Sequence, residues 1–482
     1  MNLSEKVAKN TALLVGGRLA TAASGLVGTI VATRYLGVEE FGQLLTAVTF
    51  VALFGVLTDA GVWTIAVREI AKRPQDEQAI LATVSLIGLG LSAATLVLVL
   101  GAMLLVYGGT DRDLVRLGIV IIGAQMVVSG PLGTSTAFLT ARQLALPAAL
   151  GGVLSAVGFL VTVAVVADLG FAAVAAAYPV GAALNAAVLI ASVMRTRSLR
   201  PRWNRPLAVE LLRSALPQGF VLAITVIYIR VDTIMLSVLA TDRDVGLYGL
   251  SYKVLEVLLL LPIFATTTVF PELARAGAHT ERLRMLVQGL FSAVVLAAVP
   301  MFCVFAGFAP EIVRIAGGAD YDAAAGVLRL LVLAVAFSFP ATVLFNALVA
   351  TDQQRLLARA MAVVLVGNIV VNLLLIGPFQ ARGAAFALVL SETAALALAW
   401  RLFARVSRPP HIQLPVRLAV AGGACAATVA AVRLAVVEPA ADPLLVVVLG
   451  SLAAAGVFCA VAVALRAVPV EVTSAVAQLR RR

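Results

Sequence analysis

The feature that most constrains this chain is a succession of apolar runs, each long enough for a helix that crosses a bilayer. A transmembrane helix needs about 20 predominantly apolar residues. Fourteen such runs lie at about 11–33, 42–65, 80–107, 116–139, 144–168, 171–194, 214–239, 244–270, 285–308, 325–350, 357–377, 382–403, 415–436 and 443–465. Because unpaired backbone groups are very costly in lipid, we expect each run to be a helix. The sequence therefore predicts an all-α polytopic membrane protein with about 14 transmembrane helices.

Composition and charge support this fold class. Hydrophobic residues make up 62% of the 482 residues and charged residues 13%, which is too little polar surface to cover a soluble protein. The net charge of +11 does not indicate a nucleic-acid partner, because no basic stripe carries interleaved aromatic residues. With the N-terminus in the cytoplasm, Lys and Arg are about three times as frequent in inner as in outer segments. This bias predicts a multi-pass protein of the bacterial inner (cytoplasmic) membrane, with both termini cytoplasmic.

The chain also repeats with a period of six spans. Val38–Gly42 opens the second span and Thr241–Gly246 opens the eighth, while Gly170 and Gly383 open the sixth and the twelfth. This spacing is typical of parallel repeats about an axis along the membrane normal. The predicted parts are an N-lobe (1–194), a basic cytoplasmic linker (195–213), a C-lobe (214–405) and a final pair of helices with a basic tail (406–482). The linker suits an anchor against anionic membrane lipids, and docking of a partner is the alternative.

Ionisable residues at membrane depth are the candidate functional residues, because such groups are expensive to keep in a bilayer. The cations are Arg18, Arg230 and Lys253. In a water-filled cavity they could hold a pyrophosphate or an acidic sugar. The acids are Asp59, Asp232, Glu256 and Glu392, which are candidates for coupling to an ion or for ion pairs. The alternative is structural, with Lys253 paired to Glu256 and Arg230 paired to Asp232 to fix helix register.

An enzyme active site is not visible in the sequence. We find no Gly-rich phosphate loop, no metal-ligand cluster and no nucleophile elbow, so we expect neither catalysis nor a metal or other cofactor. The predicted outer loops are short, whereas membrane glycan polymerases and ligases usually build active sites on large loops. These observations favour a transporter over a membrane enzyme.

Several motifs together carry a resemblance to a known family. They include Asn10–Arg18, Ala32–Gly42, Leu57–Gly61, Val67–Ala71 and Val245–Glu256. In order and spacing they resemble the polysaccharide transporter family, the Wzx-like flippases of the superfamily that also contains the MATE multidrug exporters and the lipid II flippases. The resemblance extends over nearly all fourteen spans.

This resemblance implies two six-helix lobes that form a V around a central cavity, plus two C-terminal helices. It implies alternating access that moves undecaprenyl-diphosphate-linked oligosaccharide, an O-antigen, capsule or exopolysaccharide unit, from the cytoplasmic to the periplasmic leaflet. Arg18, Arg230 and Lys253 match positions that recognise the diphosphate in relatives. The resemblance further implies coupling to an H+ or Na+ gradient or to the membrane potential, and partnership with a glycan polymerase and assembly proteins.

Two rival functions are weighed against a flippase. A multidrug or cation antiporter of the same fold should have an acidic cavity lined by aromatic residues. This chain instead carries three cations at membrane depth, and only 6% of its residues are aromatic. A membrane glycan polymerase or ligase is disfavoured by the short loops. A purely structural role does not explain cations kept at midplane.

Overall fold

A computed structural model describes residues 3–109, 111–195, 203–412, 415–435 and 442–466, with side chains from residue 16 onward except those of residues 18, 19 and 167. Nearly all of this part of the chain is helical, and it divides into two compact units, Met1–Gly246 and Leu247–Arg482. Each unit is considered by itself. The division falls beyond the predicted linker, because α8 packs on the helices before it. The predicted lobes and their arrangement as a V stay a prediction.

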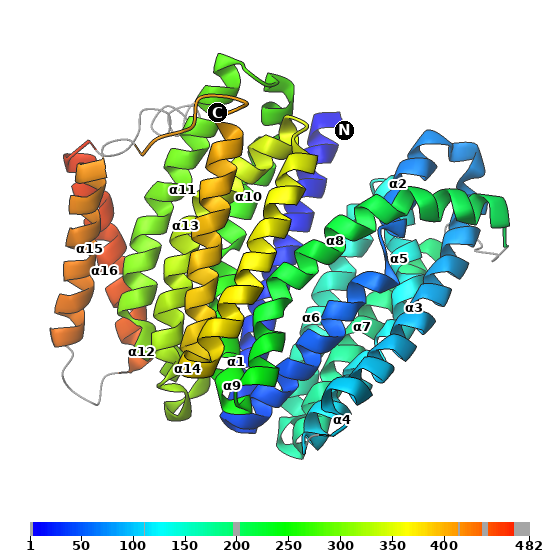
Figure 1. Ribbon diagram of the computed structural model, residues 1–482, viewed down its shortest axis with the longest axis horizontal. Coiled ribbons are helices and arrows are strands. Elements are labelled where there is room, and N and C mark those ends of the chain that lie inside the picture. The colour runs from blue at the N-terminus through cyan, green and yellow to red at the C-terminus, as the bar shows by residue number, and fades with distance from the viewer. Residues whose placement is uncertain (1–2, 110, 196–202, 413–414, 436–441, 467–482) are drawn as a thin grey trace. The chain divides into compact units, whose positions relative to one another are not determined.

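The first unit contains eight α-helices, three short 3-10 helices and the start of a ninth α-helix (Figure 1). In chain order they are α1 (Leu3–Gly55), η1 (Val56–Thr58), α2 (Val62–Lys72), η2 (Pro74–Asp76), α3 (Glu77–Tyr107), α4 (Asp113–Gly123), α5 (Met126–Ala141), α6 (Ala145–Val166), η3 (Ala167–Leu169), α7 (Phe171–Met194), α8 (Arg205–Leu239) and α9 (Asp242–Leu258). An apolar core joins α2, α3, α5, α7 and α8 around Ile65, Val84, Phe138 and Leu211.

The second unit continues α9 and adds seven further helices. The seven α-helices are α10 (Leu260–Ala276), α11 (Glu281–Gly307), α12 (Ala309–Gly317), α13 (Ala324–Ala350), α14 (Gln354–Phe403), α15 (Pro415–Ala435) and α16 (Pro443–Ala464). A short 3-10 helix, η4 (Ala319–Tyr321), lies between α12 and α13. The most buried span is α13, which packs against α10, α11 and α14. A separate core around Phe308, Cys425 and Phe458 holds α15 and α16 to α11.

Within the described residues, twelve helical segments are long and apolar enough to cross a membrane. The two longest, of 53 and 50 residues, each turn back on themselves, at Gly37 and at Gln380, so we count them as two passes each and obtain fourteen. In α14 the Asn368 amide donates to the Ser391 hydroxyl at 3.0 Å. Residues 23 positions apart in a straight helix would be about 35 Å apart. The all-α fold class with about 14 spans is therefore confirmed.

Glycine permits the first of these turns. Gly37 has φ 70 and ψ −178, a conformation that side chains with a Cβ rarely adopt. Before it, α1 packs on α6, where Gly28 faces Phe159. Beyond it, the chain packs on α4, where Ala47 meets Gly118. Figure 1 shows the blue ribbon of α1 descending to this turn and rising again beside other helices.

Three predicted spans are interrupted, which the hydropathy pattern does not indicate. The span at 42–65 breaks at residues 56–61, the span at 116–139 breaks at 124–125, and the span at 244–270 bends at Leu259. Furthermore, α8 begins at Arg205 rather than at 214, because Asn204 caps it by accepting a hydrogen bond from the Leu207 amide at 3.2 Å.

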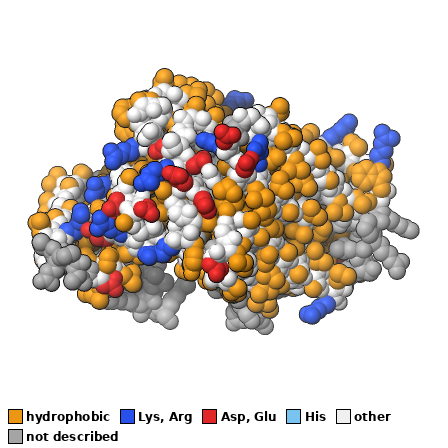
Figure 2. All heavy atoms as spheres, turned by 90° about the horizontal axis from the view of Figure 1, so that it is seen from below, with side chains coloured by type: hydrophobic (Ala, Val, Ile, Leu, Met, Phe, Trp, Pro, Cys, Tyr) orange, Lys and Arg blue, Asp and Glu red, His pale blue; other side chains and the backbone are white. Residues whose placement is uncertain are grey.

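Apolar side chains cover the flanks of several helices. On α3, Leu105 is 90% exposed and Val97 is 72% exposed, which in a chain of this composition indicates contact with lipid. Figure 2, a view onto the lower end of Figure 1, shows acidic and basic side chains gathered over part of that face, while hydrophobic side chains cover most of the remainder. Charged ends and apolar flanks are what a multi-pass membrane protein requires.

Candidate functional site

Two of the predicted cations lie at mid-depth in their helices. Since α8 ends at Leu239 and α9 begins at Asp242, a rise of about 1.5 Å per residue places Arg230 and Lys253 about 13 Å and 16 Å from that turn. The hydrocarbon core of a bilayer is about 30 Å thick, so a turn at the membrane surface would place both residues near its middle. Both side chains are half-buried. The third predicted cation, Arg18, lies on the first part of α1, and its side chain is outside the described residues.

Lys253 forms an ion pair with Glu256, the structural alternative to a role in binding cargo. Its Nζ lies 2.8 Å from Oε2 of Glu256, one helical turn further along α9. The two side chains are 36% and 32% exposed. The pair is therefore open on one side, and an anion could approach Lys253 without first breaking a sealed contact. A role for Lys253 in binding cargo stays a prediction.

The predicted acids lie in different surroundings. Asp232 is only 2% exposed in α8. Glu392 is half-buried in the second arm of α14, next to the Ser391 hydroxyl that accepts from Asn368. Asp59 lies in the break between η1 and α2, where its carboxylate accepts a hydrogen bond from the Trp63 amide at 2.9 Å. The predicted Arg230–Asp232 pair and any coupling role of these acids stay predictions.

The break at Asp59 has a local cause. Ala60 and Gly61 both have positive φ, at 46 and 81. A Cβ on Gly61 would lie 2.9 Å from the carbonyl oxygen of Ala215 in α8. The chain therefore leaves the helical path where it passes α8 and begins a new helix with Asp59 at its start. Interrupted helices at membrane depth are typical of transporter binding sites.

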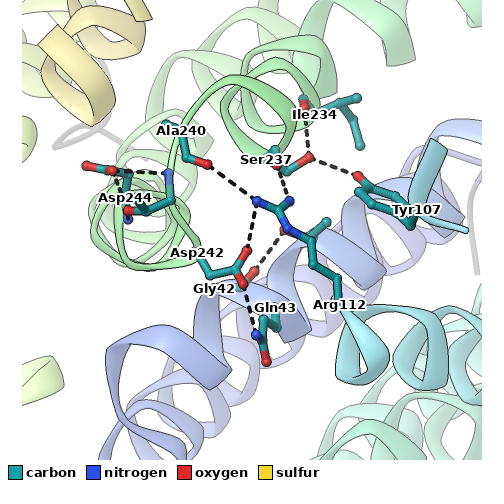
Figure 3. A network of polar contacts seen from close by, with 11 residues as sticks. Gly42, Gln43, Tyr107, Arg112, Ile234, Ser237, Ala240, Asp242 and Asp244 are labelled. Carbon is teal, nitrogen blue, oxygen red and sulfur yellow. Dashed lines mark hydrogen bonds and ion pairs between the residues drawn. The ribbon is translucent and has the colours of Figure 1, made fainter. Parts of the chain in front are cut away.

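A polar cluster that the sequence analysis did not predict joins the start of α9 to earlier helices (Figure 3). We call it the Arg112 network: Gln43, Tyr107, Arg112, Ser237, Ala240 and Asp242. Arg112 donates to the carbonyl oxygens of Ser237 and, at 3.4 Å, of Ala240, and its Nη2 lies 3.6 Å from a carboxylate oxygen of Asp242. The Arg112 and Asp242 side chains are 21% and 16% exposed.

The other members complete the network from α1 and α3. The Gln43 amide donates to the second oxygen of Asp242 at 2.8 Å. The hydroxyls of Tyr107 and Ser237, which are 1% and 0% exposed, lie 2.9 Å apart. Because buried polar groups are costly when left unpaired, these contacts define one arrangement of the α8–α9 turn on its neighbours.

The backbone packing beneath this network explains the repeated motif. Thr241 and Asp244 form a capping box at the start of α9: the Asp244 amide donates to the Thr241 hydroxyl at 3.2 Å, and the Thr241 amide donates to the Asp244 carboxylate at 3.3 Å. A Cβ on Gly42 would lie 1.8 Å from the Asp242 carbonyl oxygen, and a Cβ on Gly246 would lie 2.1 Å from the Val38 carbonyl oxygen. The two copies of the motif therefore pack directly against each other. The repeat was the sequence signal that could have located this contact.

The opposite end of α8 is also tied to the helices before it. Arg73 contacts Glu210 of α8 at 2.6 Å and Glu69 of α2 at 3.2 Å. The hydrogen bond to Glu210 raises the pKa of Arg73, which stays charged at all physiological pH values. Among the described residues, no group of three or more His, Cys, Asp or Glu side chains could hold a metal ion.

Among the described residues, twelve long apolar helices with charged side chains at their ends define a multi-pass membrane protein. The fold is similar to that of the lipid II flippase MurJ in an inward closed conformation, with a TM-score of 0.76 and 14% identity over 93% of this chain and 98% of that chain. It is also similar to an inward-facing multidrug resistance MATE family transporter of the MOP superfamily, with a TM-score of 0.61 and 15% identity over 80% and 94% of the two chains.

Comparison of the sequence with known protein families identifies the family of this chain. A profile of the family described as polysaccharide biosynthesis protein matches residues 7–277, more than half of the chain, and the chain belongs to that family. It is also 26% identical over 166 residues to the probable low-salt glycan biosynthesis flippase Agl15 of Haloferax volcanii. That match covers 34% of this chain and 35% of the relative, about a third of its length. The resemblance noted in the sequence is thereby confirmed.

Proposed function

We propose that this protein is a flippase that moves a lipid-linked oligosaccharide from the cytoplasmic to the periplasmic leaflet by alternating access. The observation that carries the proposal is the position of Arg230 and Lys253 at mid-depth in membrane-spanning helices of a chain that belongs to the polysaccharide biosynthesis protein family. Relatives and structural neighbours named as flippases of a glycan and of lipid II support it.

The chemistry of the cargo explains why cations are needed at that depth. A diphosphate that crosses the bilayer must exchange its water shell for fixed positive charge, because an uncompensated ion at midplane is very costly. An arginine can contact two phosphate oxygens at once, and a lysine supplies a mobile point charge. Arg230 and Lys253 are half-buried, so both can meet a ligand without unfolding of their helices.

Alternating access requires contacts that break on one side while they form on the other. The Arg112 network and the Arg73–Glu210 pair lie at opposite ends of α8, and each joins α8 or the turn after it to a segment that precedes the predicted linker. Charge bias places the first at the outer face and the second at the inner face. We assign them as closures of those two faces, with Asp59, Asp232, Glu256 and Glu392 as candidates for coupling to an H+ or Na+ gradient or to the membrane potential.

The cell provides the first test. Depletion of the protein should leave the lipid-linked oligosaccharide on the cytoplasmic leaflet and reduce the polymer at the surface. The wild-type chain should restore the polymer, whereas Arg230→Ala should not, although it reaches the membrane in equal amount. Unchanged surface glycan after depletion, in a strain with no second flippase, would remove the proposed function. Export of cationic dyes by the protein, without movement of the lipid-linked oligosaccharide, would favour a multidrug antiporter.

The remaining features of the proposal follow from the family. We infer that the protein acts without a catalytic step or cofactor, in the inner (cytoplasmic) membrane with both termini in the cytoplasm. A glycan polymerase and assembly proteins would take the oligosaccharide onward. O-antigen, capsule and exopolysaccharide units share the lipid diphosphate, so the proposed site fits all three.

A further inference from the structure

A basic pocket lies at one end of the second unit, between the α10–α11 connection and the segment that follows α14. Its volume is about 450 Å³, and its lining includes His279, Arg284, Arg405, Ser407 and Arg408. Charge bias places both of these connections on the cytoplasmic side. The pocket contains none of the residues assigned to the flippase site, so a function of the pocket does not depend on the proposed transport.

The pocket is held in shape by the protein itself. The His279 amide donates to the Val406 carbonyl oxygen at 3.0 Å and so joins the two segments. Further along, the side chain of Gln288 both donates to the His411 carbonyl oxygen, at 2.9 Å, and accepts from the His411 amide, at 3.0 Å. Gln288 is only 8% exposed. The segment 404–411 is therefore fixed at two points, to the α10–α11 connection and to α11, before any ligand binds.

The charges of the pocket are unbalanced. Its single acid, Glu281, is paired with Arg284 at 3.1 Å. Arg405 and Arg408 are exposed, and neither guanidinium makes a hydrogen bond or ion pair with any residue that the structure describes. Two guanidinium groups on one short segment suit a phosphate group, because each can donate two parallel hydrogen bonds to its oxygens.

The neighbouring side chains indicate where the phosphate comes from. Met285, beside Arg284 on α11, is 57% exposed, and Ile412, which follows the pocket segment, is 48% exposed. Exposed apolar side chains within a few sequence positions of the lining residues suit contact with lipid chains next to the pocket. We propose that it binds the phosphate-bearing headgroup of an anionic phospholipid of the inner leaflet, rather than free phosphate.

Lipid binding to the full chain tests this proposal. The protein purified in a neutral detergent is titrated with phosphatidylglycerol, and bound lipid is counted by native mass spectrometry, with phosphatidylcholine of the same chain length in parallel. The test variant is Arg405→Gln with Arg408→Gln. The control variant is Arg355→Gln with Arg359→Gln, which removes the same charge from two exposed positions at the start of α14, outside the pocket. Melting temperatures of both variants report whether each is folded.

The wild type and the control variant should bind phosphatidylglycerol in preference to phosphatidylcholine, and the test variant should bind it about tenfold more weakly. Inorganic phosphate in large excess should leave the bound lipid in place. Equal binding by the test and control variants would overturn the site. Displacement by inorganic phosphate would overturn the lipid as its ligand.

Discussion

The Lys253–Glu256 ion pair has two possible roles, one in holding the helix and one in binding cargo. Removing one member of a fully buried pair costs about 3–5 kcal/mol, because it leaves an uncompensated charge. This pair is about one-third exposed, so water can solvate either group. A structural role would make the two charges interdependent, whereas a role in cargo binding would make Lys253 necessary whether or not Glu256 is charged.

Substitutions at Lys253 separate these accounts. We expect Lys253→Met to lower transport about tenfold or more, because a charge-assisted contact to phosphate is lost. Lys253→Arg should retain more activity, since it keeps the charge. The double variant Lys253→Met with Glu256→Gln should transport no faster than Lys253→Met alone. Surface polymer and membrane abundance are measured for all three, and full recovery in the double variant would show that the pair only holds the helix.

A second ion pair, outside the membrane spans, gives a dependence on pH. The hydrogen bonds from Arg314, both 2.7 Å long, lower the pKa of Asp322 below its usual value of 3.8. A lowered folded-state pKa adds stability above pH 3.8 that is lost as pH falls through the lowered value. Asp322→Asn should therefore lower the melting temperature slightly at neutral pH, since the pair is half-exposed, and should not change it in strong acid. An undiminished difference in acid would contradict this assignment.

Among the helices, α8 is held at both of its ends by contacts to earlier parts of the chain. These contacts, to Arg73 and to Arg112, join it to segments that come earlier in the chain. Gly42 and Gly246 allow the turn after α8 to approach α1 at backbone distance. If this contact closes the outer face, a side chain at position 42 should keep the α8–α9 turn away from α1.

Gly42→Ala tests that closure. Its Cβ would overlap the Asp242 carbonyl oxygen, so the turn must move away. The control is Gly25→Ala in the first arm of α1, where a Cβ meets nothing within 4 Å. Both are made with Ser237→Cys, a position 0% exposed, in a chain without the three native cysteines. An impermeant thiol reagent added outside should label the Gly42→Ala protein faster than the control.

Equal labelling of the two proteins would show that the contact does not govern access. Arg112→Gln should act in the same direction as Gly42→Ala, because it removes the ion pair with Asp242 and the hydrogen bonds to the α8–α9 turn.

The sequence predicts the long helices of this fold, but it does not predict the breaks between them or the short helix α12. Hydropathy predicted the long apolar helices, because lipid imposes length and apolarity on each of them. It could not locate the break at Asp59, since that break depends on α8 lying against Gly61. Nor could it predict α12, which is only nine residues long and packs against α13 and α16.

At the scale of the whole molecule, the sequence predicts an orientation in the membrane but not the contacts between helices. The bias of Lys and Arg assigns every loop to a side, because each positive charge interacts with the membrane surface independently. The Arg112 network instead joins residues up to 199 positions apart. Such pairs follow from packing, and Arg112 in the sequence was one outer-loop charge among several.

Labelling of single cysteines tests the orientation. Asp113 has a side chain that is 85% exposed, and Trp203 is 60% exposed, so both positions can react. In intact cells an impermeant reagent should label Asp113→Cys but should label Trp203→Cys only after the membrane is opened. Labelling of both from outside would contradict fourteen spans with cytoplasmic termini.

Transport by the purified protein is the most direct test of the account. A lipid-linked oligosaccharide with a fluorescent sugar is placed in both leaflets of proteoliposomes, and an impermeant quencher is added outside. The wild type should expose the inner pool to the quencher faster than liposomes without protein, and Arg230→Ala, reconstituted in equal amount, should not. A rate for the wild type equal to that of empty liposomes, or full activity in Arg230→Ala, would contradict a flippase that carries its cargo on these cations.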